Sequence, residues 1–490
     1  MNKKLLYIFI IVVILRLVFA LSTPYLDDAY SYFHLRQIEH ISDKGYPLYN
    51  DPLSYGGRIF IFLPLMHYFL ALFFAIFKST YALKIVVNIV AASLVILVYY
   101  ITYHFTKNKN ISLLTSILSA FIPIYLDATL HTLTTKTFIV PLSFLIFYTM
   151  IRLDNSRYQL LNIISFVTLI FIDSSSIFIL LVFLVYILLL KLEYLPVKPS
   201  ENELFIFSFF FLVWVYILFF KRELLAHQLM VLWKNIPPQV IQNYFQKITP
   251  LQALYNIGFV PFIIGMYMVY HSLFKKKQKD ILVFISVIIA STFLIWLRWG
   301  DMELNLIYIG VTFMILFGIF LQNFMIFIKK TKFDYYKNII IALFVMLLAL
   351  TSVVPALFSS WRTTVTTEEQ FFAPFNVLDR FVDIDAKILS SPENGHPIAY
   401  YSQRKTAIDT NYLLISNVEN MYNDVRTIYQ THISQLAVGL MNKHKIKFIY
   451  LSDIERNEFK INQLAYFDSE CIEVIPLGKS YLYKNLCGEI

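Results

Sequence analysis

Residues 5–22, LLYIFIIVVILRLVFALS, form an apolar run near the start of the chain that contains a single charged side chain, Arg16. As an α-helix, this run would be about 27 Å long, close to the roughly 30 Å thickness of a bilayer's hydrocarbon core. It is longer than the apolar core of a signal peptide, and no small-x-small cleavage site follows it. We therefore interpret it as a retained membrane anchor.

The composition extends this interpretation to most of the chain. Of the 490 residues, 58% are hydrophobic and 15% are charged, whereas soluble proteins carry about 25% charged residues. Apolar runs of about twenty residues recur as far as residue 358, which predicts a protein with several membrane spans. The net charge of +9 comes without zinc-finger spacing, a P-loop or a dinucleotide-binding glycine motif, so we expect no nucleic-acid partner.

Short basic segments between the apolar runs predict the topology, because such loops stay on the cytoplasmic side. Six of them occur, at 1–4, 106–110, 151–157, 191–201, 274–280 and 329–337. If 58–77 and 82–105 both crossed the membrane, every later basic loop would be inverted. Residues 58–77 also contain Pro64 and His67. We therefore expect 58–77 to form an interfacial or re-entrant helix and the N-terminus to be cytoplasmic.

This topology predicts an α-helical multi-span membrane domain over 1–358 with about eleven spans, followed by a small extracytoplasmic α/β domain over 359–490. The outer loops include 23–81 and 221–253. The spans are expected at 5–22, 82–105, 111–126, 137–151, 159–174, 176–191, 204–220, 254–273, 281–297, 303–328 and 338–358.

The tail from 359 onward has more charges and a strand-like pattern. Strands are expected at 397–402, 447–452, 471–477 and 480–487, with helix over 416–443. Cys471 and Cys487 are the two cysteines of the chain and would face each other across a hairpin that turns near Gly478. A disulfide and a pair of unbonded thiols both remain open at this point.

The stretch 23-TPYLDDAYSYFHLRQIEH-40 places two adjacent carboxylates, Asp27 and Asp28, just beyond the first span. Carboxylates are preferred ligands of Mg²⁺ and Mn²⁺, and such a cation neutralises a phosphate leaving group. A carboxylate can also act as a general base on an acceptor hydroxyl. The alternative is that an aspartate caps the following helix and the remaining side chains form a solvated face.

Three consecutive segments, 26-LDDAYSYFHLRQIEHI-41, 45-GYPLYNDPLSYGGR-58 and the apolar 59–77, resemble the catalytic subunit of archaeal-type oligosaccharyltransferases. That family belongs to the GT-C class of membrane glycosyltransferases. Its members take a sugar from a polyprenyl phosphate or diphosphate on the outer membrane face and place an interfacial helix in this region. The resemblance continues through 82–136 and returns near 298 and at 391–412.

On the donor side, the resemblance implies roles for the first outer loop and for one later loop. Asp28, and next to it Asp27, would be the catalytic carboxylate, and Asp28 would also bind a divalent metal, Mn²⁺ or Mg²⁺. Arg36 and Arg298 would bind the donor phosphate. For Arg298 the alternative is a side chain that reaches from a helix end to the membrane interface.

The chain departs from the family pattern in its second acidic motif. In 123-PIYLDATLHTLTTKTF-138, the matching positions are Thr134 and Lys136. Asp127 and His131 lie one helical turn apart and would be the substitute metal ligands, with ordinary capping as the alternative.

The acceptor motif departs as well. The family's WWDYG is replaced by 391-SPENG-395, so a pocket of stacked indoles cannot form. Glu393, Gly395 and Arg404 remain as acceptor-side candidates. We therefore expect a glycan, a lipid or a protein site other than the usual sequon as acceptor.

These patterns together predict an enzyme of the cell membrane, a GT-C glycosyltransferase that acts in protein glycosylation or a related process on the outer face. The alternative is a non-catalytic relative that binds polyprenyl-linked glycans or a partner protein. A transporter is disfavoured because few charged residues, such as Arg16, Lys84 and Asp173, lie within the apolar runs.

Overall fold

The computed structural model describes residues 3–228, 230, 234–246, 249–275, 277–366, 369–467 and 470–487. The chain forms two compact units. The helical unit comprises Met1–Pro24, Leu63–Phe219 and Tyr244–Thr366, and the mixed unit comprises Tyr25–Phe62, Phe220–Asn243 and Thr367–Ile490. These two units do not define the membrane boundary. The predicted boundary between a membrane domain and a tail at residue 358 falls within the helix Val354–Thr366 and stays a prediction.

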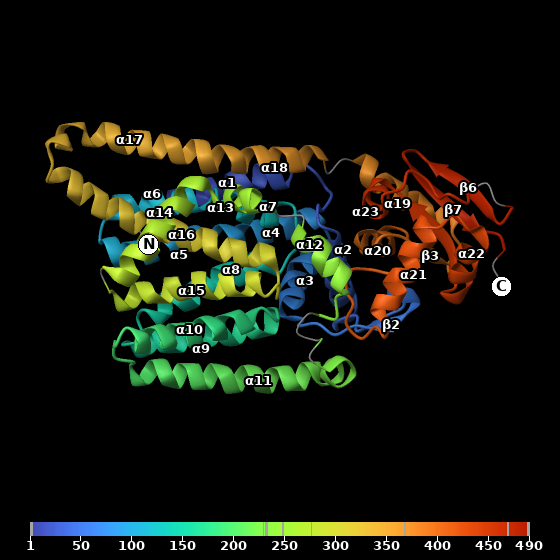
Figure 1. Cartoon of the computed structure of the whole chain (residues 1–490), viewed down its shortest axis with the longest axis horizontal. Helices are drawn as coiled ribbons and strands as arrows, with labels where there is room; N and C mark the ends of the chain where they lie inside the picture. The colour runs from blue at the N-terminus through green and yellow to red at the C-terminus, as the bar shows by residue number, and fades with distance from the viewer. Residues whose placement is uncertain are drawn as a thin grey trace. The chain divides into compact units, whose positions relative to one another are not determined.

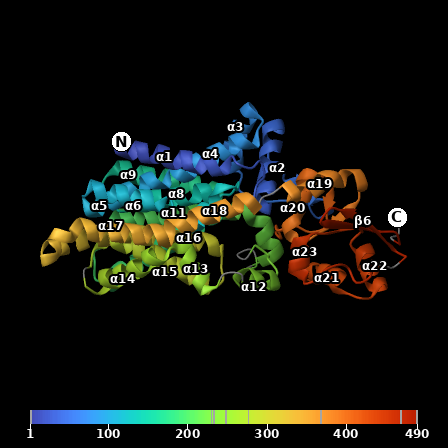
Figure 2. The same cartoon turned by 90° about the horizontal axis from the view of Figure 1, so that it is seen from above.

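In the helical unit the long helices run side by side, whereas short ones such as α3 (Leu65–Phe77) are inclined to them (Figures 1 and 2). The helices of this unit are α1 (Lys3–Ala20), α3 (Leu65–Phe77), α4 (Thr80–Ala92), α5 (Leu94–Thr106), α6 (Lys109–Ser119), α7 (Pro123–Leu130), α8 (Lys136–Met150), α9 (Ser156–Ile172), α10 (Ser176–Leu192), α11 (Pro199–His227), α13 (Pro250–Ile257), α14 (Phe259–Phe274), α15 (Lys279–Trp296), α16 (Met302–Lys329), α17 (Lys337–Leu348) and α18 (Val354–Thr366).

Within the described part of the chain, 5 stretches of helix are long and apolar enough to cross a membrane, or up to 7 if each strongly bent helix pair is one span. The bent pairs are α6 with α7, at 53°, and α13 with α14, at 91°. Every predicted span falls on a helix or a helix pair, so the predicted multi-span helical class is confirmed, whereas the count of eleven stays a prediction. Helix α3 has 13 residues, about 20 Å, which is too short to span.

Helix α16 is the centre of the helical unit and α17–α18 lies at its edge. The most apolar stretch of Met302–Lys329 is 94% buried, whereas that of Ile339–Trp361 is 22% buried. Gly318 lets α16 approach its neighbours closely. A Cβ at this position would lie 2.6 Å from Thr115 Oγ1 and 2.7 Å from Thr102 Cγ2. Small residues at such crossings allow close helix packing within membranes.

The mixed unit contains a five-stranded sheet in the order β4-β3-β5-β7-β6, with parallel pairing from β4 to β5 and antiparallel pairing from β5 to β6. Its elements are α2 (Ala29–Lys44), β1 (Asn50–Asp51), η1 (Ser54–Gly56), β2 (Arg58–Ile59), α12 (Pro238–Gln246), α19 (Glu369–Phe381), β3 (Lys387–Leu389), α20 (Pro392–Tyr401), β4 (Lys405–Thr406), α21 (Val418–Gln430), α22 (Ser434–Lys443), β5 (Ile446–Leu451), α23 (Asp453–Phe459), β6 (Ile472–Leu477) and β7 (Ser480–Asn485).

Side chains from α21, α22 and α23 form the apolar core on one face of this sheet, where Ile449 of β5 is fully buried. The next residue, Tyr450, packs against Phe375 of α19, with ring centroids 5.3 Å apart. This alternation follows the two-residue period of a strand. It gives the predicted α/β tail a sheet with helices on both faces (Figure 1).

Two predicted elements of the tail need correction. Residues 397–402 were expected as a strand, but 392–401 form α20, and the expected helix over 416–443 is divided into α21 and α22. The aromatic and β-branched composition favours a strand, yet tertiary contacts decide such segments. The open question about the cysteines is also answered, because Cys471 and Cys487 form a disulfide that closes the β6–β7 hairpin.

Residues Tyr25–Phe62, part of the predicted outer loop 23–81, fold with the C-terminal part of the chain. Their short hairpin pairs β1 with β2, and Leu53 accepts a backbone hydrogen bond of 2.8 Å from Thr406 N of β4. Helix α2 packs against α20, as the ring contact between Tyr32 and Tyr401 shows. The loop that carries the acidic pair is thus part of the mixed unit.

Candidate functional site

The acidic pair lies at the beginning of α2, and both side chains are exposed. Asp28 is the N-cap residue, and its carboxylate accepts a hydrogen bond of 3.2 Å from Tyr30 N. A helix N-terminus carries partial positive charge and stabilises a carboxylate there. Asp28 therefore has a structural role of its own, whatever chemistry it performs.

Arg36 lies one and a half turns into α2 from Tyr30 and forms a buried ion pair with Asp51. Its two terminal nitrogens lie 2.9 and 2.7 Å from the two carboxylate oxygens of Asp51, and the side chains are 8% and 0% exposed. Burial acts to raise the pKa of Asp51, but Arg36 and backbone hydrogen bonds outweigh it and lower the pKa. Because the guanidinium of Arg36 already binds a carboxylate, Arg36 is not included among the proposed ligands of the donor phosphate.

A second buried ion pair joins the loop to the segment after β4. Arg58 Nη2 lies 3.1 Å from Asp409 Oδ1, and Ser54 donates a hydrogen bond to Asp409 Oδ2. His396 Nε2 is 3.8 Å from Asp409 Oδ1 and is buried without a hydrogen bond. Burial is the main reason that the pKa of His396 falls to about 4, so its imidazole is neutral near pH 7.

The segment 391–395, which replaces the family's acceptor motif, is the beginning of α20. Glu455 fixes it, because its buried carboxylate accepts hydrogen bonds from Ser391 N at 2.9 Å and Asn394 Nδ2 at 2.7 Å. A Cβ on Gly395 would lie 2.3 Å from the carbonyl oxygen of Ile408. Glycine is therefore required for this close approach, while Glu393 points outward and is exposed.

Two segments that the resemblance singled out thus lie against each other in the mixed unit, although more than 350 residues separate them. Tyr400 of α20 donates a hydrogen bond of 3.1 Å to Glu39 of α2. Tyr401 Oη and Tyr32 Oη lie 3.2 Å apart. The acidic pair, Glu393 and Gly395 therefore belong to one packed arrangement of α2 and α20.

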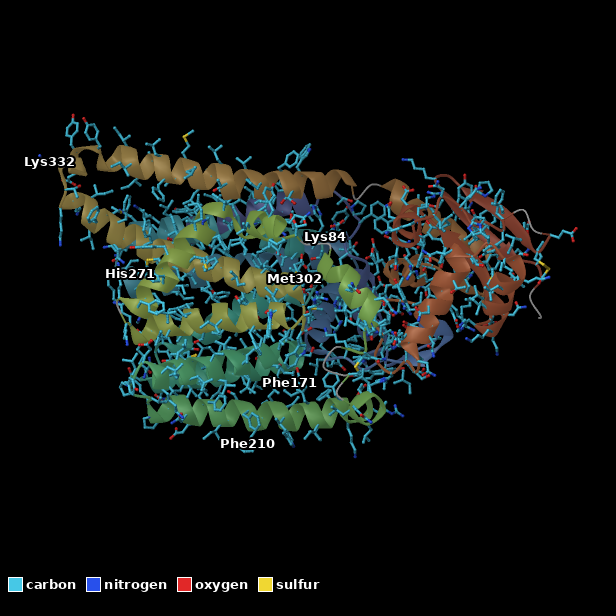
Figure 3. The ribbon with its side chains drawn as sticks, in the orientation of Figure 1. Lys84, Phe171, Phe210, His271, Met302 and Lys332 are labelled. Carbon is cyan, nitrogen blue, oxygen red and sulfur yellow. A yellow bond between two sulfur atoms is a disulfide. The ribbon has the colours of Figure 1, made fainter. Side chains whose placement is uncertain are left out.

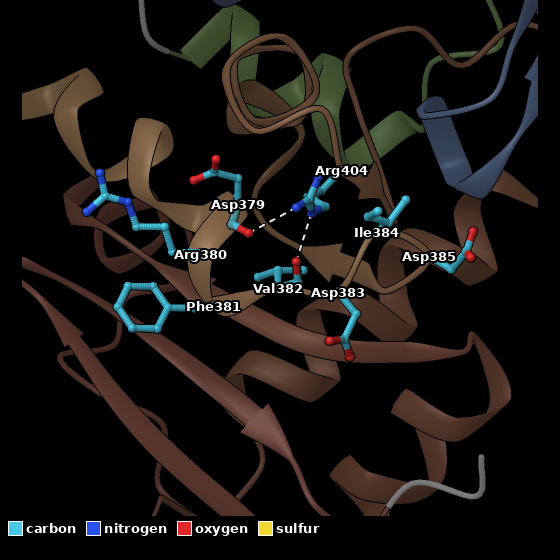
Figure 4. A pocket seen from close by; sticks show the side chains of 8 residues that line it. All are labelled: Asp379, Arg380, Phe381, Val382, Asp383, Ile384, Asp385 and Arg404. Carbon is cyan, nitrogen blue, oxygen red and sulfur yellow. Dashed lines mark hydrogen bonds between the residues drawn. The ribbon is translucent and has the colours of Figure 1, made fainter.

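Arg404, the third acceptor-side candidate, lines a hollow of about 470 Å³ together with residues 379–385 (Figure 4). Its guanidinium donates hydrogen bonds to the carbonyl oxygens of Val382, at 2.8 Å, and Asp379, at 2.9 Å. The residue thus closes the C-terminal end of α19, where carbonyl groups lack helical partners.

In the helical unit, we define the α7–α8 corner as residues 129–136 and the side chains of Arg16, Lys84, Asn88, Asp173, Asp301 and Glu303 that surround them. Figure 3 shows Lys84 and Met302 at one end of this unit, with His271 and Lys332 at the other.

Arg16, whose partner the sequence does not reveal, is 1% exposed in this corner. It donates hydrogen bonds to Asn88 Oδ1 at 3.0 Å and to Thr129 Oγ1 at 2.7 Å. Lys84 is 0% exposed and donates to the carbonyl oxygens of Ala20, at 3.2 Å, and Thr23, at 2.7 Å. The acceptors of Arg16 carry no net charge, so these hydrogen bonds do not cancel its positive charge.

The two predicted substitute metal ligands lie at the end of α7. Asp127 accepts a hydrogen bond of 2.6 Å from Ser359 of α18. His131 is buried, and burial, followed by Lys84 and Arg16, lowers its pKa to about 4. Within the described residues, no group of three or more His, Cys, Asp and Glu side chains is arranged to hold a metal ion.

Lys136, at the position where the family has an acidic residue, is the first residue of α8. Its ammonium lies 2.8 Å from Asp301 Oδ2 and also pairs with Glu303. Arg298 is exposed in the preceding turn, with φ of 53°. The two acids of this segment, Asp301 and Glu303, therefore pair with Lys136.

The sequence signals for these pairs differ in strength. Arg58, Asp409 and Lys136 stand in segments that the resemblance singles out, but nothing in the sequence indicates which residues they pair with. Asp51 also lies in such a segment, 45–58, without a role assigned to it, whereas Glu455 lies outside all of them.

No protein-family model matches the sequence, and neither does any curated protein. Solved structures do match. The oligosaccharyltransferase of Archaeoglobus fulgidus in its apo form has a TM-score of 0.67 and 14% identity, over 93% of this chain and 70% of that one. Other structures of the enzyme, AglB, hold an inhibitory peptide with a dolichol-phosphate, or Zn and sulfate.

A second match is ArnT from Cupriavidus metallidurans bound to undecaprenyl phosphate. It has a TM-score of 0.55 and 9% identity, over 99% of each chain. Both enzymes are GT-C glycosyltransferases, so this chain has the GT-C fold, and the resemblance drawn from the sequence is confirmed at the level of the fold. The apolar helices and this fold together support a membrane protein, while the orientation stays a prediction.

Proposed function

We propose that this protein transfers a sugar or glycan from a polyprenyl phosphate or diphosphate, such as a dolichyl-linked donor, to an acceptor on the outer face of the cell membrane. One observation carries the proposal. The GT-C fold extends over at least 93% of the chain in the matches to AglB and ArnT, structures of which hold dolichol-phosphate and undecaprenyl phosphate. Fold likeness alone does not assign chemistry, so the site residues have to support it.

The carboxylates at the beginning of α2 support a catalytic role. Asp28, with Asp27 beside it, is exposed at the N-terminus of α2, a helix that the buried Arg36–Asp51 ion pair and contacts with α20 hold in place. In the proposed step, an acceptor nucleophile attacks the anomeric carbon and loses its proton to Asp28 or Asp27. The bond to the phosphate oxygen breaks, and the phosphate leaves with that electron pair.

Arg298 supports the donor side of the proposal. It is exposed in the turn between α15 and α16, where its planar fork can bind two phosphate oxygens. The expected Mn²⁺ or Mg²⁺ has a weaker basis here, because the predicted ligand His131 lies near Lys84 and Arg16. We therefore derive no step through a metal ion.

The acceptor side differs from that of an enzyme that grips a sequon with two indoles. Residues 391–395 form a helix N-terminus that Glu455 fixes, and Glu393 is its exposed acidic group. We infer an acceptor other than the usual sequon, such as a glycan, a lipid or another protein site. We also expect contacts with membrane lipid.

A second candidate is a non-catalytic relative that binds polyprenyl-linked glycans or a partner protein. Two observations favour it. Arg36 and Arg58 each form an ion pair with a buried carboxylate. Lys136 stands at a position where the family has an acidic residue. Binding without turnover would distinguish it from the transferase.

The test uses membranes that contain the wild type, Asp27→Asn/Asp28→Asn or the control Asp334→Asn, an acidic residue of a predicted cytoplasmic loop. Radiolabelled polyprenyl-linked sugars and native lipid extract are supplied, and consumption of the label is followed. We expect consumption in the wild type and the control and at least a hundredfold loss in the double variant. Equal consumption in all three would exclude the acidic pair, and binding without consumption would favour the second candidate.

A further inference from the structure

The mixed unit contains a hollow that the proposed transfer step does not use. It has a volume of about 470 Å³ and is formed by the end of α19, the turn that leads to β3, and Arg404, which directly precedes β4 (Figure 4). Sites for small molecules have volumes of about 300–1,000 Å³. We call it the α19–β3 hollow, and its lining residues are Asp379, Arg380, Phe381, Val382, Asp383, Ile384, Asp385 and Arg404.

Two large apolar side chains of the hollow are exposed. Phe381, the last residue of α19, is 44% exposed, and Ile384, in the following turn, is 73% exposed. Val382 between them is 2% exposed and belongs to the buried core, so the chain turns the other two to the surface. An aromatic ring has an electron-rich face, which attracts the C–H groups on one side of a sugar ring.

Two carboxylates of the hollow are ionised, and each has one oxygen available. Lys447 Nζ lies 2.6 Å from Asp383 Oδ2, and Lys405 Nζ lies 2.8 Å from Asp385 Oδ1. The hydrogen bond and charge of each lysine hold the pKa of its partner below the usual value. Within the described residues, Asp383 Oδ1 and Asp385 Oδ2 accept no hydrogen bond. Both oxygens can therefore accept hydrogen bonds from hydroxyl groups.

Arg404 supplies hydrogen-bond donors. Its guanidinium donates to three carbonyl oxygens, those of Val382, Ser402 and Asp379. Since a guanidinium has five N–H groups, these bonds leave one N–H on each of its two terminal nitrogens. The three carbonyl groups fix the side chain, and the remaining N–H groups can donate to the oxygens of a ligand.

The charges of the hollow favour a neutral ligand. The lining contains three carboxylates and two guanidinium groups, and two of the carboxylates are paired with lysine. A nucleic acid or an anionic lipid would be repelled by the carboxylates, and a cation would be repelled by the guanidinium and ammonium groups. A neutral sugar satisfies both sets of groups, because each of its hydroxyls donates and accepts hydrogen bonds.

We propose that the α19–β3 hollow binds a neutral sugar unit of the acceptor glycan, with Phe381 against the C–H face of that sugar. Asp383, Asp385 and Arg404 hydrogen-bond its hydroxyl groups. The assignment of the sugar to the acceptor rests on the proposed function, whereas sugar binding by the hollow does not. The inference selects a glycan among the acceptors named above, and it gives Arg404 a physical role on the acceptor side.

The first experiment measures sugar binding and needs no enzyme activity. The full-length chain is purified in a detergent without a sugar head group, because a maltoside would compete for the hollow. Saturation-transfer difference NMR is then recorded in titrations with glucose, galactose, mannose, N-acetylglucosamine and, as the anionic comparison, glucuronate. We expect at least one neutral sugar to bind the wild type. Phe381→Ala and Asp383→Asn/Asp385→Asn should each weaken that binding at least about fivefold.

Two substitutions elsewhere in the mixed unit serve as matched controls. Ile433→Ala shortens an apolar side chain that is 60% exposed, and Glu473→Gln removes a carboxylate that is 50% exposed and paired with Lys484. Both should bind sugar as the wild type does. If Phe381→Ala does not survive purification, Ile384→Ala replaces it. The proposal is overturned if no neutral sugar binds, if glucuronate alone binds, or if the hollow variants bind as well as the controls.

The second experiment assigns the sugar to the acceptor. Consumption of radiolabelled polyprenyl-linked sugars is measured against the concentration of a glycan fraction from native extract, for the wild type, Phe381→Ala and Ile433→Ala. We expect Phe381→Ala alone to raise the half-saturating glycan concentration, by at least about fivefold. An unchanged concentration would overturn the acceptor assignment even where the hollow binds sugar. If the wild type consumes no donor, the proposed function and the acceptor assignment fail together, whereas the NMR titrations still decide whether the hollow binds sugar.

Discussion

The two compact units bury positive charge in different ways. In the mixed unit, Arg36 and Arg58 each meet a carboxylate, and both pairs are almost completely buried. In the helical unit, Arg16 is buried just as deeply, but its hydrogen-bond acceptors are the amide of Asn88 and the carbonyl and hydroxyl groups of Thr129.

This difference shows what each region does. A buried ion pair is electrically neutral, so the pairs in the mixed unit fix the shape of the 25–62 loop and leave little field behind. A buried cation whose hydrogen bonds go to neutral dipoles keeps its charge, and Arg16 is such a cation. The loop with Asp27 and Asp28, by contrast, is the part that positions carboxylates.

The largest effect is expected from Asp409→Asn in the mixed unit. The substitution leaves Arg58 as a buried charge without its partner, which costs about 3–5 kcal/mol of stability. Thermal unfolding of the full-length protein in detergent measures the loss. Arg58→Met/Asp409→Leu serves as control and should be more stable than Asp409→Asn, because it removes both charges. A fully stable Asp409→Asn protein would contradict the ion-pair assignment.

In the mixed unit, the free energy of unfolding should also depend on pH through His396, with a smaller effect. The pKa of His396 is lowered from 6.5 to about 4, chiefly by burial, with Asp409 acting to raise it and Arg58 and Arg36 acting to lower it. Since the unfolded chain binds the proton more tightly, stability is unaffected above about pH 6.5 and falls as the pH drops toward 4, by up to about 1.4 kcal/mol per unit.

The matched variant for this pH dependence is His396→Gln, which cannot titrate. Unfolding temperatures measured from pH 7.5 to pH 4.5 should fall less steeply for the variant than for the wild type. The lowered pKa of Asp51 acts in the same direction but only at more acidic pH, where its carboxylate is protonated. Parallel pH profiles for the two proteins would show that His396 is not buried as the structure has it.

The helical unit should respond more mildly to loss of its buried arginine. Arg16→Met removes the donor to Asn88 and Thr129 and leaves three neutral acceptor atoms without that bond, which costs about 1–3 kcal/mol of stability. No opposite charge is stranded, so the loss in unfolding temperature should be smaller than for Asp409→Asn. Arg16→Lys keeps the charge and tests the hydrogen bonds alone. An effect equal to that of Asp409→Asn would remove the contrast between the two units.

The sequence predicts local features of this molecule well. Length and apolarity decide helix formation within a short window, so each predicted span falls on helix. The strand predicted at 397–402 is wrong because residues distant in the sequence decide its structure. Helix α2 packs against this segment, and Glu455 accepts a hydrogen bond from Asn394 at the beginning of the same helix, α20.

The site is predictable only in part, for the same reason. The resemblance points to Asp28, Lys136 and Arg298, but pairing is a property of the folded chain. Arg58 meets Asp409 across 351 residues, and Lys136 meets Glu303 across 167. No spacing rule reaches that far. Nor does the sequence reveal that Arg36 pairs with Asp51, and its role toward phosphate stays a prediction.

The smallest effect is expected at Asp28, and it separates capping from catalysis. Asparagine caps a helix about as well as aspartate, whereas alanine loses about 1 kcal/mol. Asp28→Asn should therefore unfold at the wild-type temperature and Asp28→Ala slightly below it. If Asp28 also performs the proposed proton transfer, both variants lose donor consumption equally. A protein in which only Asp28→Ala is impaired would instead have Asp28 as a cap alone, and would move the catalytic role to Asp27.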